Sequence, residues 1–459
     1  MGTRRGTEAV SPVAAHEHLS AHARPRLDAA VLLTVYLVLL LGVPSNLRVA
    51  ALGSIGRPSV LWGLVLIAFW IISRLQVRAH DVRPMRQPIR FAFLAFLIIA
   101  LVSFASALLR GQPDDQVSPA ITGIVRLGSW AGVLFVALDG IRTMNDLTRL
   151  ARRLAVGVSL LAVLGLLQVL TRQSLIEFFG SIPGMVLAED GELGARAGLV
   201  RATATAYHPL EYATTLMSAL PLVIAAALSA GFRARPSRWS WMWWGAVALI
   251  AALALIGVSR SAIIGFLFVA VAMIPVFPRH TRAIVVVAGA GLGAAVAVLV
   301  PGLIGVTLAL FTGAATDSST QSRVGALDRA PEFIRESPLI GSGFGTFLPR
   351  YYIFDNEWAM IAVELGLFGA VAFVAIIAAA VWSAARARYQ SGQPDVRLLG
   401  YSLIVSMLVI SLMFAFFDAL AFSMTAGLFF FYAGLCGALR NVGAADAQLR
   451  GEHGEWRNH

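Results

Sequence analysis

The chain has 459 residues, of which 58% are hydrophobic and 13% charged, and its mean hydropathy is +0.77. This composition excludes a soluble globular protein, which needs far more polar surface. The formal net charge of +11 does not indicate nucleic-acid binding, because the basic residues, all arginines, lie in short runs between apolar blocks. Such runs are typical of the connections in a polytopic membrane protein.

Apolar blocks of about 17–25 residues, long enough to cross a hydrocarbon core, recur along the chain. They predict an all-α integral membrane protein with about twelve transmembrane helices, near 27–43, 58–73, 90–109, 119–138, 154–170, 209–230, 239–258, 261–277, 283–305, 357–385, 398–417 and 420–438. Residues 1–26 show no small-residue cleavage site before the first block, so we expect a cytoplasmic tail followed by an anchor. The transmembrane domain is then 27–438, and 439–459 form a second cytoplasmic tail.

The arginine distribution predicts the orientation of the helices. With both termini inside, the inner segments hold 24 arginines and the outer segments 11, while Arg126 lies within a helix. This imbalance predicts a multi-pass protein of the bacterial inner (plasma) membrane with both termini cytoplasmic. The two longest connections, 171–208 and 306–356, are then extracytoplasmic loops, and long loops often carry function. In the first of them, residues 175–179 are apolar enough to lie flat at the interface.

Several arginines lie on the predicted outer face, where topology does not require them. Arg196 and Arg201 belong to the first long loop, Arg323 to the second, and Arg260 to a very tight turn. Guanidinium groups bind phosphates through paired hydrogen bonds, so the pattern predicts a pyrophosphate site built from Arg201, Arg260 and Arg323. The alternative is that the loop arginines are solvated or pair with nearby acidic residues, but Arg260 has almost no loop around it.

Two charged residues are predicted inside the membrane. Arg126 and Glu364 each lie about two helical turns below the outer surface, where a charge is costly and usually faces a partner or a cavity. Their similar depth makes them candidate partners. They either line a functional cavity or form a buried ion pair that orients two helices.

Two positions are candidate general bases. His208 is the only histidine predicted outside, and it precedes Pro209 at a helix start, where it is a base, a substrate contact or a simple loop residue. Asp355 and Asn356 end the second long loop and open a helix. Either residue is a common N-cap, but Asp355 is also placed to accept a proton from a sugar hydroxyl.

Other chemical signatures are missing from the sequence. There is no metal-binding motif, no nucleotide-binding loop and only one cysteine, Cys436, so no internal disulfide is expected. We expect the acidic pair Asp114 and Asp115 to be solvated in a short outer loop. The glycine-rich segment 341–345 predicts a turn at which the backbone approaches something closely.

Three stretches together resemble a known family. They are Arg201 to Pro209 with its His-Pro ending, the Ser-Arg-Ser turn around Arg260, and the run from Arg323 through Pro-Leu-Ile-Gly-Ser-Gly to Asp355-Asn356 and Glu364-Leu-Gly-Leu-Phe-Gly. Over roughly residues 195–370 the chain resembles the O-antigen ligase and O-antigen polymerase superfamily of bacterial membrane glycosyltransferases. One departure is that Asp355 stands where the family commonly has a histidine before the asparagine.

The resemblance implies a metal-independent, inverting glycosyltransferase of the C-type architecture, without a cofactor, that works in cell-envelope polysaccharide biosynthesis. It would move a glycan from a polyprenyl-pyrophosphate carrier, such as undecaprenyl pyrophosphate, to an acceptor hydroxyl outside the membrane. The arginines would bind the pyrophosphate, Asp355 or His208 would take the acceptor proton, and Asn356, Glu364, Arg126 and Arg196 would support the site. The missing histidine favours a polymerase, whose acceptor is another lipid-linked glycan, over a ligase, whose acceptor is a lipid or protein.

Two other classes of function stay open. A transporter or flippase of lipid-linked glycans would show internal repeats and polar residues near the membrane midplane. The sequence shows no repeat, and its unusual charges crowd the outer edge. A non-catalytic assembly protein of the envelope would lack a cavity that joins the arginines to the membrane lipids.

Overall fold

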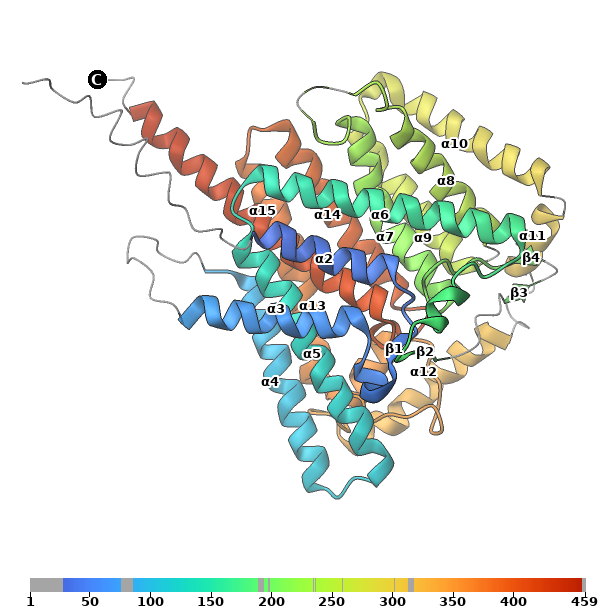
Figure 1. Cartoon of the computed structure of the whole chain (residues 1–459), viewed down its shortest axis with the longest axis vertical. Helices are drawn as coiled ribbons and strands as arrows, with labels where there is room; N and C mark the ends of the chain where they lie inside the picture. Colours follow the sequence, from blue (N-terminus) through green and yellow to red (C-terminus); the bar gives the residue numbers. More distant parts are fainter. Residues whose placement is uncertain are drawn as a thin grey trace, which may run out of the picture.

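The computed structural model describes residues 28–75, 86–188, 194–196, 199–233, 235, 237–257, 259–300, 302–312 and 318–455, so the expected tail 1–26 lies outside the described residues. The helices are α2 (Ala29–Gly42), α3 (Pro58–Leu75), α4 (Pro88–Leu109), α5 (Asp114–Gly140), α6 (Met144–Thr171), α7 (Pro209–Leu228), α8 (Met242–Ile256), α9 (Arg260–Met273), α10 (Arg279–Leu299), α11 (Leu303–Thr312), α12 (Ser318–Glu336), α13 (Glu357–Gln390), α14 (Pro394–Met413) and α15 (Ser423–Glu455) (Figure 1). Short 3₁₀ helices are η1 (Ala50–Ile55), η2 (Glu177–Ser181), η3 (Ile274–Val276) and η4 (Ala419–Ala421). Strands β1 (Leu47–Val49) and β2 (Met185–Leu187) pair antiparallel, as do β3 (Ala195–Arg196) and β4 (Leu199–Val200).

The prediction of an all-α membrane protein is confirmed. Each of the twelve predicted segments is helical. Within the described residues, eight helices are long and apolar enough to cross a membrane, and three shorter apolar helices are 29–42, 242–256 and 260–276. The predicted segment 283–305 was wrong at its end, because the chain turns at Gly302, whose φ is +81°, and separates α10 from α11.

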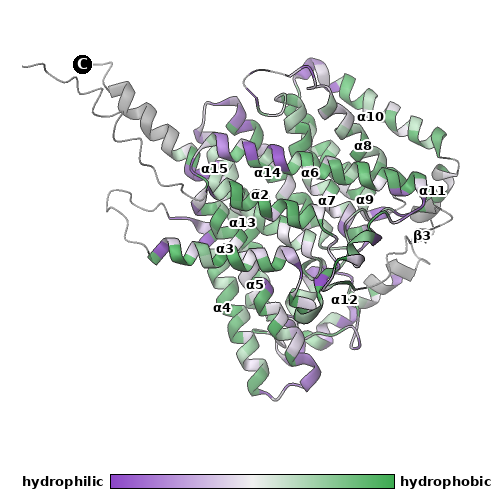
Figure 2. Ribbon diagram, viewed as in Figure 1, coloured by the Kyte–Doolittle hydropathy of each residue, from purple (hydrophilic) through white to green (hydrophobic). Residues whose placement is uncertain are grey.

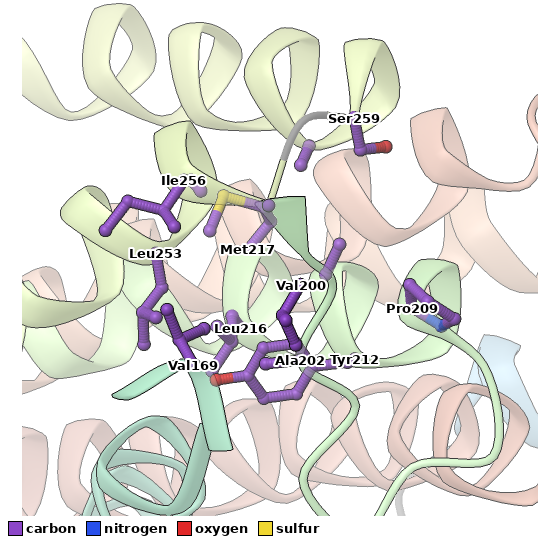
Figure 3. A pocket seen from close by; sticks show the side chains of 14 residues that line it. Val169, Val200, Ala202, Pro209, Tyr212, Leu216, Met217, Leu253, Ile256 and Ser259 are labelled. Carbon is purple, nitrogen blue, oxygen red and sulfur yellow. The ribbon is translucent and has the colours of Figure 1, made fainter. Parts of the chain in front are cut away.

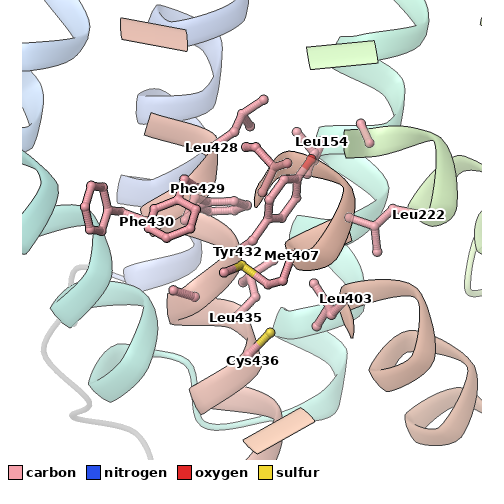
Figure 4. Packing of buried hydrophobic residues seen from close by; sticks show 14 of the residues in the cluster. Leu154, Leu222, Leu403, Met407, Leu428, Phe429, Phe430, Tyr432, Leu435 and Cys436 are labelled. Atoms are coloured by element: carbon pink, nitrogen blue, oxygen red, sulfur yellow. The ribbon is translucent and has the colours of Figure 1, made fainter. Parts of the chain in front are cut away.

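The core of the bundle is organised around α15 and α7. The four consecutive aromatic residues 429–432 of α15 are fully buried. Because four consecutive residues point to all sides of a helix, α15 is surrounded by other elements at this level. Figure 4 shows Phe429, Phe430 and Tyr432 packed among leucines of neighbouring helices, with Cys436 one turn further along. Helix α10, by contrast, is almost entirely exposed along its apolar length. Figure 2 shows the hydrophobic colour over the helices on the outside of the bundle as well, as expected where lipid and not water covers the surface.

The connections predicted to lie outside contact one another at one end of the bundle. Residues 47–49 pair with 185–187, and Ser45 donates a hydrogen bond to the Glu211 carboxylate. Arg350 of the second long connection forms an ion pair with Asp115 in the first turn of α5, which corrects the expectation that Asp115 is simply solvated in a loop.

The segments predicted to lie inside meet at the other end. Arg74 of α3 and Arg90 of α4 both form ion pairs with Asp139 at the end of α5, and Arg149 of α6 lies near Asp28. This separation is what the predicted alternation of inner and outer connections requires. The sidedness and the cytoplasmic termini stay predictions.

The second long connection, expected to be a loop, contains helices α11 and α12. Helix α12 is amphipathic, because Ala326, Ala330 and Phe333 recur at helical spacing and pack on one side. They form a small separate core with Phe354 and with Val363 of α13. The mostly small apolar residues of this face give a weak pattern, so the sequence did not predict the helix.

Helix α13 is broken near its outer end. Gly366 has φ +65° and ψ −165°, a conformation that interrupts the helical hydrogen bonds. The segment 337–347 replaces the lost bonds: the N–H groups of Ser342 and Gly343 donate to the carbonyls of Val363 and Glu364, and the carbonyls of Pro338 and Leu339 accept from Leu367 and Phe368. A Cβ on Gly366 would lie 2.5 Å from the backbone of Leu339, so only glycine fits. The glycine-rich turn therefore approaches α13 itself.

Candidate functional site

The connection between α14 and α15, residues 414–423, links the parts of the candidate site. At one side the buried Glu357 of α13 accepts a hydrogen bond from the Leu420 N–H at 2.8 Å. At the other side the Ala421 carbonyl and the Ser423 hydroxyl accept hydrogen bonds from Arg57 at 3.2 and 2.6 Å. The ring of Phe422 lies 5.9 Å from the ring of His208. This connection, which we name the α14–α15 connection, thus joins segments far apart in the sequence.

Three arginines form what we name the outer basic cluster: Arg48, Arg57 and Arg126. The charge of Arg57 repels those of Arg48 and Arg126, and burial lowers the pKa of Arg57 while the nearby Glu211 carboxylate partly restores it. Among the described residues, neither Arg57 nor Arg126 makes an ion pair with a carboxylate. The cluster therefore holds positive charge that an anion can neutralise.

Arg126 is not the partner of Glu364, contrary to the sequence-based expectation. The two side chains form no ion pair, and the Glu364 carboxylate instead accepts a hydrogen bond from the Phe347 N–H at 3.2 Å. Glu364 thereby holds the segment 337–347 against the break in α13. Arg126 lies toward Arg57, and its buried Nε has no hydrogen-bond partner within the described part of the chain. An orphaned buried donor beside other positive charges favours an anion site.

Glu211 and His208 fix the start of α7. The buried Glu211 carboxylate accepts hydrogen bonds of 2.8 Å from the Ser45 hydroxyl and from the N–H groups of Tyr207 and Met424. His208 is the N-cap of α7, and its Nδ1 accepts from the Leu210 N–H at 3.2 Å. Burial, together with the positive charge of Arg201, lowers the pKa of His208 to about 4. A capping histidine with so low a pKa is a weak proton acceptor at neutral pH.

Asp355 and Asp418 form an acidic pair beside the start of α13. The N-cap of α13 is Asn356, whose Oδ1 accepts from the N–H groups of Trp358 and Ala359. Asp355 therefore does not cap the helix, and its backbone has φ +48°, a region that few non-glycine residues adopt. Asp418 accepts from the Asn356 N–H at 3.2 Å, and burial and the charge of Asp355 raise the pKa of Asp418 to about 6.

An apolar pocket lies among the segments that carry Arg201, His208 and Arg260. Figure 3 shows Val200 and Ala202, which flank Arg201, at the wall of this pocket. Pro209, directly after His208, and Ser259, directly before Arg260, line it as well. The buried Gln168 at the end of α6 holds the first of these segments, because its Oε1 accepts from the N–H groups of Thr203 and Ala204. Arg201 and Arg260 are both half-buried, and the chain neighbours of Arg201, His208 and Arg260 line the same pocket.

The other outer arginines differ in what the structure says of them. The side chains of Arg196 and Arg323 lie outside the described residues, and only their backbones are placed, in β3 and α12. Arg329 lies over the Tyr352 ring at 5.5 Å, and Arg350 lies over Tyr351 while pairing with Asp115. Arg350 thus pairs with an acidic residue, as the alternative allowed, but the partner is Asp115, which the sequence analysis expected to be solvated.

Sequence reasoning missed Arg57, Glu211 and Asp418 as members of the site. Arg57 was counted only for topology, although it lies on the predicted outer side, and Glu211 was explained by the helix start alone. Asp418 is a single carboxylate in the otherwise apolar stretch 412–422. An isolated acidic residue between two predicted membrane helices is typical of a functional site, so Asp418 could have been predicted from the sequence.

Part of the chain matches a known protein family. Residues 246–374 match the family model described as O-Antigen ligase. The matched range includes Arg260, Arg323, Asp355, Asn356 and Glu364 and ends within α13. The matched range does not include the outer basic cluster and His208, which precede it, or Asp418, which follows it. These residues reach the candidate site through the fold. No curated protein matches the chain.

Proposed function

We propose that the chain, whose residues 246–374 match the O-antigen ligase family model, belongs to the O-antigen ligase and polymerase superfamily and transfers a glycan from a polyprenyl-pyrophosphate carrier to an acceptor hydroxyl outside the membrane. The observation that carries the proposal is the outer basic cluster. Two half-buried arginines, Arg57 and Arg126, make no ion pair with a described carboxylate. Arg57 binds the α14–α15 connection at Ala421 and Ser423, and Asp418 of the acidic pair lies on the same connection. One short segment thus contacts an arginine for a leaving pyrophosphate and carries a carboxylate of the pair that takes the acceptor proton.

In the proposed reaction the acceptor hydroxyl attacks the anomeric carbon of the donor glycan. The carbon–oxygen bond to the pyrophosphate breaks, and the polyprenyl pyrophosphate leaves with both bonding electrons. Arg57 and Arg126, with Arg201, Arg260 and Arg323 as further candidates, stabilise the negative charge that develops there, a role that fixed guanidinium groups perform well. The hydroxyl proton passes to Asp355, and attack from the face opposite the pyrophosphate inverts the anomeric centre.

Asp355 is the better of the two candidate bases. His208 uses its Nδ1 to cap α7, and its pKa of about 4 makes it a poor acceptor. Asp355 is not occupied in capping, because Asn356 performs that role. The neighbouring Asp418 places a second carboxylate beside Asp355, and the two charges act on each other. We propose a polymerase over a ligase, since Asp355 replaces the histidine of the family pattern.

The direct test incubates purified protein with a polyprenyl-pyrophosphate-linked glycan and measures longer glycans and released polyprenyl pyrophosphate. Chain growth supports a polymerase, and transfer only after a separate lipid acceptor is added supports a ligase. If reconstituted protein moves the lipid-linked glycan across vesicles without transfer, the chain is a flippase and the proposal fails.

A further inference from the structure

A groove lies between α6 and α8 at the predicted inner end, remote from the candidate site. It contains about 1170 Å³ of empty space, lined by Val156, Leu160 and Val163 of α6 and by Trp241 and Leu249 on the side of α8. Leu160 and Trp241 are each 64% exposed, so the groove faces outward from the bundle. In a membrane this face meets lipid, and its lining of aliphatic and aromatic side chains suits an acyl chain.

Two arginines stand at the end of this groove. Arg233 lines it directly, and Arg152 lies one turn before Val156 on the same face of α6. The two charges lie near enough to repel each other. Neither makes a hydrogen bond or an ion pair with the residues that the structure describes, whereas the adjacent Arg149 lies near carboxylates and Arg153 donates to the Ala30 carbonyl.

Arg152 lies just before the predicted membrane segment 154–170, in a helix that begins at Met144, and Arg233 lies just after the predicted segment 209–230. Arginine side chains at the ends of membrane helices extend to the headgroup level. Trp239 and Trp241 at the same end are half or more exposed, as tryptophans commonly are at the membrane interface.

We propose that this α6–α8 groove binds one anionic glycerophospholipid. Its phosphate lies between Arg152 and Arg233, and an acyl chain runs along Val156, Leu160 and Val163. Two neighbouring positive charges without acidic partners favour a negative headgroup over a zwitterionic one, and basic pockets between helices on the inner side bind such headgroups. The site is independent of the proposed transfer chemistry.

The test is native mass spectrometry of the purified full chain with added phosphatidylglycerol or phosphatidylcholine of the same acyl chains. We expect one retained phosphatidylglycerol and about tenfold less phosphatidylcholine, a difference of the size that one charge pair supplies. The double variant Arg152→Gln/Arg233→Gln should lose this preference, and Arg152→Lys/Arg233→Lys should keep most of it. The matched control, Arg142→Gln/Arg279→Gln, removes the same charge from exposed positions at the same end and should bind like the unchanged protein.

A second variant tests the acyl part of the site without touching charge. Gly245 lines the groove and has open space where a Cβ would stand, so Gly245→Leu should fold and fill the groove. We expect this variant to retain less phosphatidylglycerol. Inorganic phosphate alone should not raise the melting temperature of any variant, because the proposed site also needs the acyl chain. Equal retention of the two lipids, or unchanged retention in the Arg152→Gln/Arg233→Gln variant with an unaltered melting temperature in detergent, would overturn the proposal.

Discussion

The arginines at the two ends of the bundle differ in their partners, and this difference separates structural from functional charge. At the inner end, Arg74 and Arg90 share the carboxylate of Asp139, which also accepts from the Trp70 indole, so the positive charge is locally compensated. At the outer end, Arg57 binds a carbonyl and a hydroxyl, and Arg126 makes no ion pair with a carboxylate of the described residues, although Arg126 and Arg90 alike have a buried Nε without a partner there. The same residue type thus fastens helices at one end and leaves charge available for an anion at the other.

The substitution Asp355→Asn should have the largest effect at the outer end. If Asp355 is the base, transfer should fall about 10²- to 10⁴-fold, because an amide cannot accept the proton. Stability should change little, since Asn356 and not Asp355 caps α13. The matched control is Asn356→Asp, which keeps a capping oxygen and should keep most of the activity. An active Asp355→Asn enzyme would remove Asp355 from the chemistry.

Neutralising the outer basic cluster should come next. Arg57→Gln or Arg126→Gln should reduce transfer about 10²- to 10³-fold, as expected for loss of one group that stabilises a developing charge. Arg90→Gln at the inner end should lower the melting temperature but leave the rate per folded molecule unchanged. If the inner variant reduced transfer as much as the outer ones, the distinction between the two ends would fail.

The acidic pair should give a smaller, pH-dependent effect. Because the folded-state pKa of Asp418 is about 6 and its ordinary value is 3.8, the folded chain binds this proton more tightly than the unfolded chain. Stability should therefore fall as the pH rises through this interval, and Asp418→Asn should remove that fall. Transfer should also decline as the pH drops through about 6, because Asp418 then becomes protonated and the site loses one of its two negative charges beside the acceptor hydroxyl. Melting curves and rates measured from pH 4 to 8 check both expectations.

The smallest effect is expected at His208. Asn is among the preferred N-caps, so His208→Asn should preserve the start of α7 and change transfer by no more than about threefold. His208→Ala should lower stability by about 1 kcal/mol through loss of the cap, with little change in rate per folded molecule. A rate reduced as far as in Asp355→Asn would identify His208 as the base instead.

Local pattern was enough to predict the helices but not the partners of the charged residues. Each apolar block became a helix because burial of backbone polar groups in lipid allows little else. Arg126, Asp355 and His208 were singled out as unusual positions, since charge or a polar ring at the outer edge of a helix needs an explanation, and their roles in a site stay predictions. Their roles depend on contacts such as Arg57 with Ala421, which are separated by most of the chain and which no local spacing encodes.

The motif around Gly341 and Gly366 shows the same limit. The sequence predicted a close backbone approach, but the partner, the broken turn of α13, was identified only in the structure. Helix α12 was missed because Ala326 and Ala330 form a weak apolar face. It becomes recognisable only through the aromatic residues that pack on it.

The break in α13 also has a consequence for biogenesis. An interrupted helix that enters a bilayer leaves N–H and C=O groups unpaired, each at a cost of several kcal/mol. In this chain the segment that pairs with them, 337–347, is synthesised before α13. In the predicted topology this segment lies on the far side of the membrane, and its translocation must then precede the completion of the helix.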